Sequence, residues 1–154
     1  MTLFNLLLVD DEKPLIEAMA RRLVQRGFTV DCVFSGSEAL AFLKNNASVD
    51  VVVLDVKMPG IDGIETLEAI KKQYPMLEVI MLTGHATVPS AVDAMKNGAF
   101  DYVMKPCDLE DLIAKAAKAA GRKKDREDKI RDVKTMPYLT DKKREELIAK
   151  ILEA

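Results

Sequence analysis

Several residue types and motifs are scarce or missing, and each absence excludes a class of protein. The two cysteines, Cys32 and Cys107, are too few for a disulfide framework and show no metal-ligand spacing. No apolar run approaches the roughly 20 residues of a membrane-spanning helix, and residues 1–5 lack the basic segment that begins a signal peptide. No Gly-x-x-x-x-Gly-Lys motif is present, which excludes P-loop nucleotide chemistry. We therefore expect a soluble protein of a reducing cytoplasm.

The size and charge of the chain indicate one domain and a tail. With 154 residues, 49% of them hydrophobic, the chain is long enough for about one globular domain. Residues 1–121 contain 12 Lys/Arg and 17 Asp/Glu, whereas residues 122–154 contain 11 and 8. Because the tail mixes charges of both signs, a solvated helical tail is favoured over a nucleic-acid-binding arm. We predict a domain over residues 1–121 and a helical tail over residues 122–154.

Five short strand-like runs alternate with helical patterns before residue 121. They cover residues 4–9, 28–33, 51–54, 79–82 and 100–104. Most are continuous apolar runs, as in a buried parallel sheet, whereas the second alternates with polar residues, as an edge strand does. This alternation predicts the α/β class, with helices on both faces of a doubly wound, five-stranded parallel sheet. Right-handed crossovers give it most simply the strand order 2-1-3-4-5.

Apolar residues at helical spacing predict a helix after each strand. Pro14 suits the first turn of the first helix, and Ser35 with Glu38 predicts a capping box on the second. The third covers residues 64–74. The fourth is expected to begin at a Thr87 cap and to turn its apolar residues inward, namely Val88, Ala91, Val92 and Met95.

Polar side chains that could bind a ligand or take part in a reaction follow the strands at their carboxyl ends. They are Asp10 and Asp11 after the first strand, Asp55 after the third, Thr83 at the end of the fourth and Lys105 after the fifth. Taken singly, each has an ordinary explanation as a helix cap, a turn residue or a surface lysine. In a doubly wound sheet, however, these strand ends converge in one crevice. We therefore predict that the five side chains form one site.

The three carboxylates of this predicted site set its chemistry. Neighbouring carboxylates repel by about 4 kcal/mol per pair at about 4 Å and an effective dielectric constant of about 20, so they require a cation or their pKa values rise. Oxygen ligands, with a carbonyl group from the loop after Asp55, favour Mg²⁺. Lys105 and Thr83 can receive an anion beside the metal, and a phosphoryl group is the obvious candidate. Asp55 can then act as a nucleophile and form an aspartyl phosphate.

Four motifs around these residues resemble one known family. They are Leu8-Val9-Asp10-Asp11-Glu12, the run LDVKMPGIDG from Leu54 to Gly63, Leu82-Thr83-Gly84-His85 and the run DYVMKP from Asp101 to Pro106. In order and spacing they are similar to the receiver domains of bacterial two-component response regulators, over residues 3 to about 121. The stretch from Thr87 to Tyr102 looks most like receivers that precede AAA+ transcriptional activators. No output domain is recognised in the 33 residues after Gly121, so we do not expect direct nucleic-acid binding.

The resemblance implies a role for each residue of the predicted site. Asp55 would accept a phosphoryl group from a sensor histidine kinase or a phosphotransfer protein. Asp11, Asp55 and the backbone carbonyl of Lys57 would bind Mg²⁺, with Asp10 acting directly or through water. Lys105 would hold a phosphoryl oxygen, and the Lys105–Pro106 peptide bond would be cis.

The resemblance also implies a switch. Thr83 would swing toward the phosphoryl group and Tyr102 would rotate inward behind it, which would change the face formed by the fourth helix, the fifth strand and the fifth helix. The output would pass to a protein effector or to a second copy of the chain, with no membrane partner. Lys57 and His85 would overhang the site, and we hypothesise that they tune autodephosphorylation. We expect no enzyme activity beyond this self-phosphorylation and its reversal.

The tail predicts two helical segments. The fifth helix, capped by Asp108, is expected to run to about Thr135, before Met136-Pro137, and Thr140 is expected to cap a further helix. That helix carries an apolar stripe formed by Leu147, Ile148, Ile151 and Leu152.

Two observations bear on the role of the tail. A heptad seam continued along the fifth helix includes Ile130 and Val133 but also Lys123 and Arg126, so it gives little support to a coiled coil. Docking of the apolar stripe on its own domain or on a second subunit is favoured over a dedicated effector surface.

Two other functions fit parts of the site. An aspartyl-phosphate phosphatase would share the nucleophile and the metal, but those enzymes resemble Asp-x-Asp-x-Thr, and Lys57 occupies the second acidic position here. A phosphorylation-independent scaffold with the same fold would have no need of the complete set of carboxylates, hydroxyl and lysine. We therefore favour a phosphoacceptor signalling module that acts through protein partners.

Overall fold

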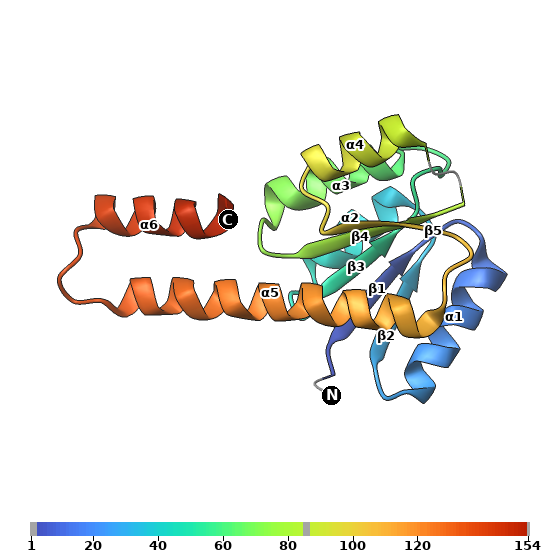
Figure 1. Cartoon of the computed structure of the whole chain (residues 1–154), viewed down its shortest axis with the longest axis horizontal. Helices are drawn as coiled ribbons and strands as arrows, with labels where there is room; N and C mark the ends of the chain where they lie inside the picture. Colours follow the sequence, from blue (N-terminus) through green and yellow to red (C-terminus); the bar gives the residue numbers. More distant parts are fainter. Residues whose placement is uncertain (1–2, 85–86, 154) are drawn as a thin grey trace.

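The computed structural model describes residues 3–84 and 87–153 and contains one five-stranded parallel sheet (Figure 1). Its strands are β1 (Asn5–Val9), β2 (Thr29–Val33), β3 (Val51–Leu54), β4 (Glu78–Thr83) and β5 (Asp101–Met104). Their order in the sheet is β2-β1-β3-β4-β5, and each neighbouring pair is parallel. The predicted fold class and strand order are confirmed, and β2 lies at an edge as expected.

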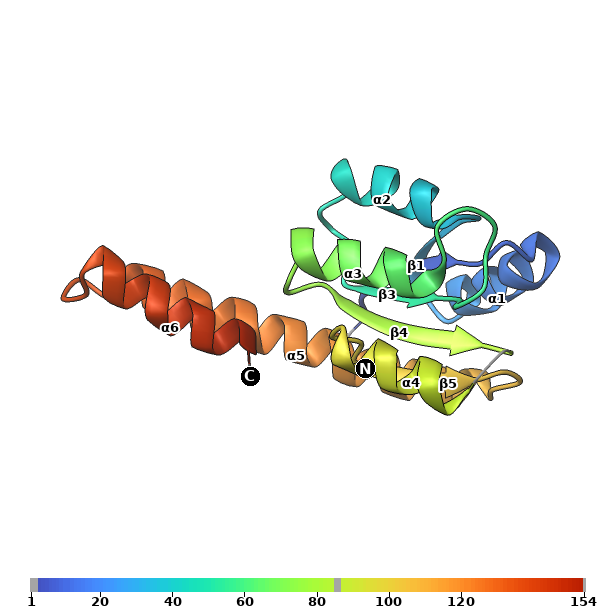
Figure 2. The same cartoon turned by 90° about the horizontal axis from the view of Figure 1, so that it is seen from above.

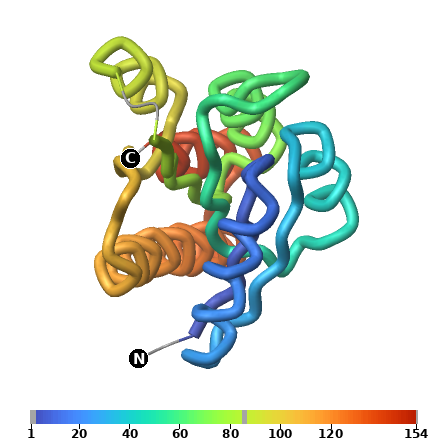
Figure 3. Tube along the Cα trace, turned by 90° about the vertical axis from the view of Figure 1, so that its right-hand side faces the viewer, coloured from blue at the N-terminus to red at the C-terminus, as the bar shows by residue number. Residues whose placement is uncertain are grey.

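Helices cover both faces of this sheet. They are α1 (Lys13–Gln25), α2 (Gly36–Lys44), α3 (Gly63–Gln73), α4 (Val88–Lys96), α5 (Leu109–Thr135) and α6 (Asp141–Glu153). Successive strand residues point to opposite faces, so Leu7 and Val52 pack with α2, α3 and α4, whereas Leu8 and Val53 pack with α1 and α5. Figure 3, viewed from the right-hand side of Figure 1, shows α2 and α3 on one side of the strands and α1 and α5 on the other.

Side-chain caps fix where α2 and α3 begin. Ser35 Oγ accepts a hydrogen bond from Glu38 N at 3.1 Å, as predicted, but the Glu38 carboxylate accepts from Phe34 N at 2.9 Å. The second half of the predicted capping box is therefore wrong, because the glutamate reaches one residue further back. A complete capping box instead joins Asp62 and Glu65 at the start of α3, which anchors the loop that follows β3.

The predicted inward face of α4 is wrong for most of its residues. Val88 is 78% exposed, and Val92 and Met95 are also exposed, whereas Ala94 is the buried residue of this helix. The reason is the position of α4 beside the edge strand β5. A helix at the edge of a sheet is covered along a narrower stripe than a helix at its centre, so α4 leaves apolar side chains in solvent.

The tail forms a helical hairpin with the end of α5. As predicted, α5 ends at Thr135, and Thr140 Oγ1 accepts a hydrogen bond from Lys143 N at 3.2 Å at the start of α6. Figures 1 and 2 show α6 folded back along α5. The four residues of its apolar stripe are half-buried. Docking of the stripe within the same chain is confirmed. The predicted boundary between residues 121 and 122 falls inside the continuous helix α5 and stays a prediction.

Within residues 3–84 and 87–153, no helix is both long and apolar enough to cross a bilayer.

Candidate functional site

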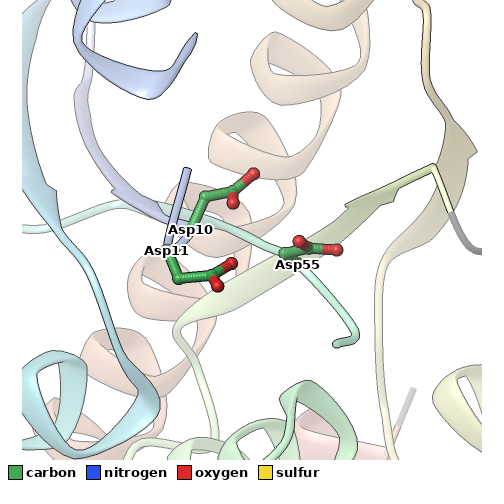
Figure 4. Close-up of side chains that lie close together, drawn as sticks. All are labelled: Asp10, Asp11 and Asp55. Atoms are coloured by element: carbon green, nitrogen blue, oxygen red, sulfur yellow. The ribbon is translucent and has the colours of Figure 1, made fainter. Parts of the chain in front are cut away.

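Asp10, Asp11 and Asp55 lie together at the carboxyl edge of the sheet (Figure 4). Asp10 and Asp11 follow β1 and Asp55 follows β3, and these two strands pair with Val9 opposite Leu54. The Asp55 backbone N–H donates to Val9 O at 3.0 Å, which fixes Asp55 beside the end of β1. One carboxylate oxygen from each aspartate lies within 4.8 Å of the others. The predicted convergence of the three carboxylates is confirmed.

The three carboxylates differ in their surroundings. Asp10 and Asp55 are only 2% and 3% exposed, whereas Asp11 is exposed. Asp10 Oδ1 accepts a hydrogen bond from Glu12 N at 3.0 Å, and Asp55 Oδ1 accepts one from Val56 N at 2.8 Å. The backbone therefore orients one oxygen of each buried carboxylate and leaves the other oxygen for further partners.

Lys105 supplies the positive charge of the site. Its Nζ lies 2.5 Å from Asp10 Oδ2 and 4.0 Å from Asp55 Oδ2. Burial alone would lower the pKa of Lys105, but the hydrogen bond and charge of Asp10, followed by the charge of Asp55, outweigh it and raise that pKa. The ammonium group therefore stays charged. The peptide bond from Lys105 to Pro106 is cis, as predicted.

Thr83 completes the group at the end of β4. It is fully buried, and its side chain hydrogen-bonds to Asp55. Burial is the main cause that raises the pKa of Asp55 above its ordinary value, and the charge of Asp10 adds to it. The Thr83 hydrogen bond and the charge of Lys105 act in the opposite direction. All five side chains predicted from the strand ends thus meet at one place.

Tyr102, the other predicted switch residue, contacts α4 through its hydroxyl group. Tyr102 Oη lies 2.6 Å from Ser90 Oγ, in the first turn of that helix. Ser90 also belongs to the capping box of α4, in which Thr87 is the N-cap residue. Sequence reasoning did not single out Ser90, although its place three residues after a threonine cap was a usable signal. The two predicted switch residues therefore have different contacts: Thr83 contacts the carboxylate site, and Tyr102 contacts α4.

The loop after β3 holds two further residues of interest. Lys57, predicted to offer its backbone carbonyl to a metal, lies there with an exposed side chain. Gly63, which sequence reasoning missed, begins α3 directly against the acceptor, since a Cβ atom at this position would lie 2.0 Å from Asp55 O. His85 lies outside the described residues, so its predicted role stays a prediction.

The chemistry of this donor set fits a hard divalent cation. Three carboxylates outnumber the single ammonium group, so negative charge is left uncompensated in a largely buried place. All the candidate ligand atoms of Asp10, Asp11 and Asp55 are oxygens, which Mg²⁺ and Ca²⁺ prefer. These three residues could hold a metal ion.

Comparison with curated proteins supports the same conclusion. The chain is 39% identical over 111 residues to the DNA-binding transcriptional regulator NtrC of Salmonella typhimurium, covering 72% of this chain and 24% of that protein. It is 36% identical over 120 residues to the C4-dicarboxylate transport transcriptional regulatory protein DctD of Rhizobium meliloti, covering 78% and 26%. The chain therefore spans about a quarter of the length of these relatives.

A solved structure and a family model each match most of the chain. A response regulator receiver domain protein from Clostridium thermocellum superimposes with a TM-score of 0.74 at 38% identity, covering 79% of this chain and 97% of that one. The family model of the response regulator receiver domain matches residues 6–117, which include β2 to β5, all of β1 except Asn5, and the carboxylates Asp10, Asp11 and Asp55. The chain therefore belongs to the response regulator receiver domains of two-component systems.

Proposed function

We propose that the chain accepts a phosphoryl group on Asp55 from a phosphohistidine of a sensor histidine kinase or a phosphotransfer protein. One carboxylate oxygen of Asp55 attacks the phosphorus and forms an O–P bond. The bond from phosphorus to the imidazole nitrogen breaks, and its electron pair stays with the imidazole. The observation that carries this proposal is the position of Lys105 Nζ, 4.0 Å from Asp55 Oδ2 within the acidic cluster. Nucleophile, metal ligands and fixed cation meet at one point.

The metal in this proposal is Mg²⁺. Asp10, Asp11 and Asp55 would hold it with the backbone carbonyl of Lys57, and it would neutralise charge on the phosphoryl oxygens during transfer. Asp10 Oδ1 accepts from Glu12 N and Oδ2 contacts Lys105 Nζ, so a metal held by Asp10 through Oδ2 would share that atom with Lys105. This sharing supports a role for Asp10 either as a direct ligand or through water.

Lys105 and Thr83 would hold the oxygens of the transferred group. The Lys105 ammonium group is nearer to Asp10 than to Asp55, at 2.5 Å against 4.0 Å, so a small movement would bring it to a phosphoryl oxygen. The Thr83 side chain already hydrogen-bonds to Asp55 and is placed to donate to the same group. Both contacts stabilise negative charge where it develops.

We infer that phosphorylation switches the face formed by α4, β5 and α5. Tyr102 of β5 is hydrogen-bonded to α4 at Ser90, so its rotation would disturb the first turn of that helix. Exposed apolar side chains on this face, Val92 and Met95 of α4 and Met104 of β5, are suited to a protein partner. The partner would be an effector or a second copy of the chain, rather than nucleic acid or a membrane, and the compartment would be the cytoplasm.

The chain would catalyse only its own phosphorylation and dephosphorylation. We propose that Lys57 and His85, each two residues beyond a residue of the site, tune the decay of the aspartyl phosphate. An unchanged decay rate in the double variant Lys57→Ala/His85→Ala would reject this role.

Phosphorylation by a small donor tests the central step. The protein is incubated with Mg²⁺ and acetyl phosphate and weighed intact by mass spectrometry, beside Asp55→Asn and the matched control Asp31→Asn. Asp31 is an exposed aspartate on the edge strand β2. A labile phosphoryl adduct on the wild type and the control, and its loss in Asp55→Asn, supports the proposal. An adduct that persists in Asp55→Asn, or its absence from folded wild-type protein, would overturn it and favour a phosphorylation-independent scaffold.

A further inference from the structure

A fully buried carboxylate lies at the opposite end of β4 from Thr83. Glu78, the first residue of β4, is 0% exposed. Its Oε1 lies 3.4 Å from Lys71 Nζ and 3.6 Å from an Arg126 guanidinium nitrogen, and its Oε2 lies 3.4 Å from Arg122 Nε. A buried charge is tolerated only when it is paired and hydrogen-bonded. Two of these cations, Arg122 and Arg126, come from α5 beyond residue 121, so the interior of the domain depends on the helix that continues into the tail.

Arg126 has a second set of partners on α6. It is 4% exposed, its Nε donates to Ile151 O at 3.2 Å, and its Nη2 donates to Leu152 O. These carbonyls lie in the last turn of α6 that the structure describes, which ends at Glu153. A cation is favoured toward the carboxyl end of a helix by the helix dipole. One guanidinium group therefore contacts both the buried carboxylate of β4 and the end of the tail helix.

The apolar side chains of α6 are only partly buried where the helix docks on α5. None of the described α6 residues, 141–153, is buried, and its apolar stripe stays half-exposed on the hairpin. On the α5 side, Ile130 and Val133 are buried. The Arg126 contacts are made at the end of α6 that is farthest in sequence from its connection to α5, so they are placed to keep the last turns docked.

We propose that α6 is an intramolecular latch that Arg126 holds closed, with the charge of Glu78 keeping Arg126 in place. Opening the latch would break the two hydrogen bonds that the Arg126 guanidinium group donates to α6, and hydrogen bonds from a charged group are costly to lose. Removing the charge of Glu78 would leave a buried cation less well compensated, so Arg126 would move toward solvent and release α6. The occupant of the Ile130 and Val133 surface is α6 of the same chain, and a second copy could bind there only after the latch had opened.

Hydrogen exchange of the full chain tests the latch, with mass spectrometry resolving peptides of α6. In Arg126→Met the last turns of α6 should exchange about tenfold faster or more, since two hydrogen bonds from a charged group are lost. The matched control is Arg131→Met on the same helix. The side chain of Arg131 is 65% exposed and pairs with Asp128 at 3.1 Å, so this control should exchange like the wild type.

Two more variants separate the latch from a general loss of folding. Glu78→Gln should accelerate exchange in α6 through Arg126. The double variant Glu78→Gln/Arg126→Met removes both buried charges, so it should keep β1 and β3 protected while α6 still exchanges fast. Wild-type exchange of α6 in both Arg126 variants would show that the apolar stripe alone holds the tail, and would overturn the latch. Unchanged exchange in Glu78→Gln, with fast exchange in Arg126→Met, would overturn the role of Glu78. Neither result depends on phosphorylation of Asp55.

Discussion

The ammonium group of Lys105 lies 2.5 Å from the carboxylate of Asp10, although the two residues are 95 positions apart in the chain. This ion pair joins the end of β1 to the loop after β5 across the carboxyl edge of the sheet. It also places Lys105 in competition with any metal that uses Asp10 Oδ2. Binding of a divalent cation to the cluster should therefore weaken this pair and free Lys105 to turn toward Asp55.

Removal of that lysine should strengthen metal binding while it weakens phosphorylation. In Lys105→Met the three carboxylates lose their compensating charge, so affinity for Mg²⁺ should rise by about tenfold, which corresponds to about 1.4 kcal/mol. The adduct formed with acetyl phosphate should decrease, because a phosphoryl oxygen loses its partner. Isothermal titration calorimetry and intact mass measure the two effects. Lys72→Met, which changes an exposed lysine of α3, is the control, and weaker Mg²⁺ binding by Lys105→Met would contradict the competition.

The raised pKa of Asp55 predicts a pH-dependent stability. A carboxyl group whose pKa is higher in the folded state stabilises the fold fully below its ordinary pKa of about 3.9. That stabilisation is lost as the pH rises through the raised value. At neutral pH and without metal, ionised Asp55 therefore destabilises the fold, and Asp55→Asn should raise the urea midpoint in EDTA.

The same variant should lose its advantage in two conditions. The gain should shrink as the pH is lowered through the raised pKa of Asp55 toward the ordinary value of about 3.9, because Asp55 takes up its proton in the folded wild type over that range. It should also shrink when Mg²⁺ is added, since the cation binds the native wild type. Asp31→Asn on β2 is the control and should change neither midpoint. Equal midpoints of wild type and Asp55→Asn at neutral pH in EDTA would show that burial of this charge has no net cost.

Two glycines give a matched pair of opposite predictions. A Cβ atom at Gly63 would lie 2.0 Å from Asp55 O and 2.7 Å from Val56 Cα, and backbone atoms cannot move aside cheaply. Gly63→Ala should therefore destabilise the protein by about 3 kcal/mol and displace the acceptor loop. A Cβ atom at Gly121, within α5, would have no heavy atom within 4 Å, so Gly121→Ala should stabilise by up to about 1 kcal/mol. Urea unfolding measures both, and equal effects of the two would contradict the close approach at Gly63.

Most of the fold follows from short-range patterns in the sequence. The runs at residues 51–54 and 79–82 are buried on both faces, so their apolar character identified them as central strands. The site then followed from topology, because parallel strands bring their carboxyl ends to one edge. That is why Asp10, Asp55 and Lys105 could be grouped although they are far apart in the chain.

The predictions that were wrong or missing concern side chains whose contact partners in the fold cannot be identified from the sequence. The apolar face of α4 was predicted to be buried, but the burial of a helix depends on which strand it packs against. Because α4 packs beside the edge strand β5, Val88 is exposed. In the sequence, Arg126 was evidence against a coiled coil along the fifth helix, because a charged residue interrupts the apolar heptad seam. In the structure it is buried because Glu78 and the end of α6 pair with it. Gly63 and Ser90 were missed because the contact that makes each important, with Asp55 and with Tyr102, lies outside its own helix.

The hydrogen bond between Tyr102 and Ser90 predicts an energetic coupling between β5 and α4. Ser90 Oγ accepts from Thr87 N at 3.2 Å and can donate its single proton to Thr87 O at 3.0 Å. Thr87 Oγ1 also donates to Ser90 Oγ at 2.9 Å, and either hydroxyl can be the donor of the 2.6 Å bond between Ser90 Oγ and Tyr102 Oη. Tyr102→Phe and Ser90→Ala remove the same hydrogen bond from its two sides. The loss of unfolding free energy in the double variant should therefore be about 1 kcal/mol smaller than the sum of the two single losses.

A double-mutant cycle in urea measures this coupling. Ser90→Ala also weakens the cap of α4. That loss of unfolding free energy is the same in the wild type and in Tyr102→Phe, so it cancels in the cycle and leaves the contribution of the shared bond. Tyr138→Phe is the control, since Tyr138 is 95% exposed in the connection before α6; its effect should be small and should add to that of Ser90→Ala. Phosphorylation of Asp55 should still occur in Tyr102→Phe, because the hydroxyl group contacts α4 and not the carboxylates. Additive effects of Ser90→Ala and Tyr102→Phe would mean that this bond does not couple the strand to the helix.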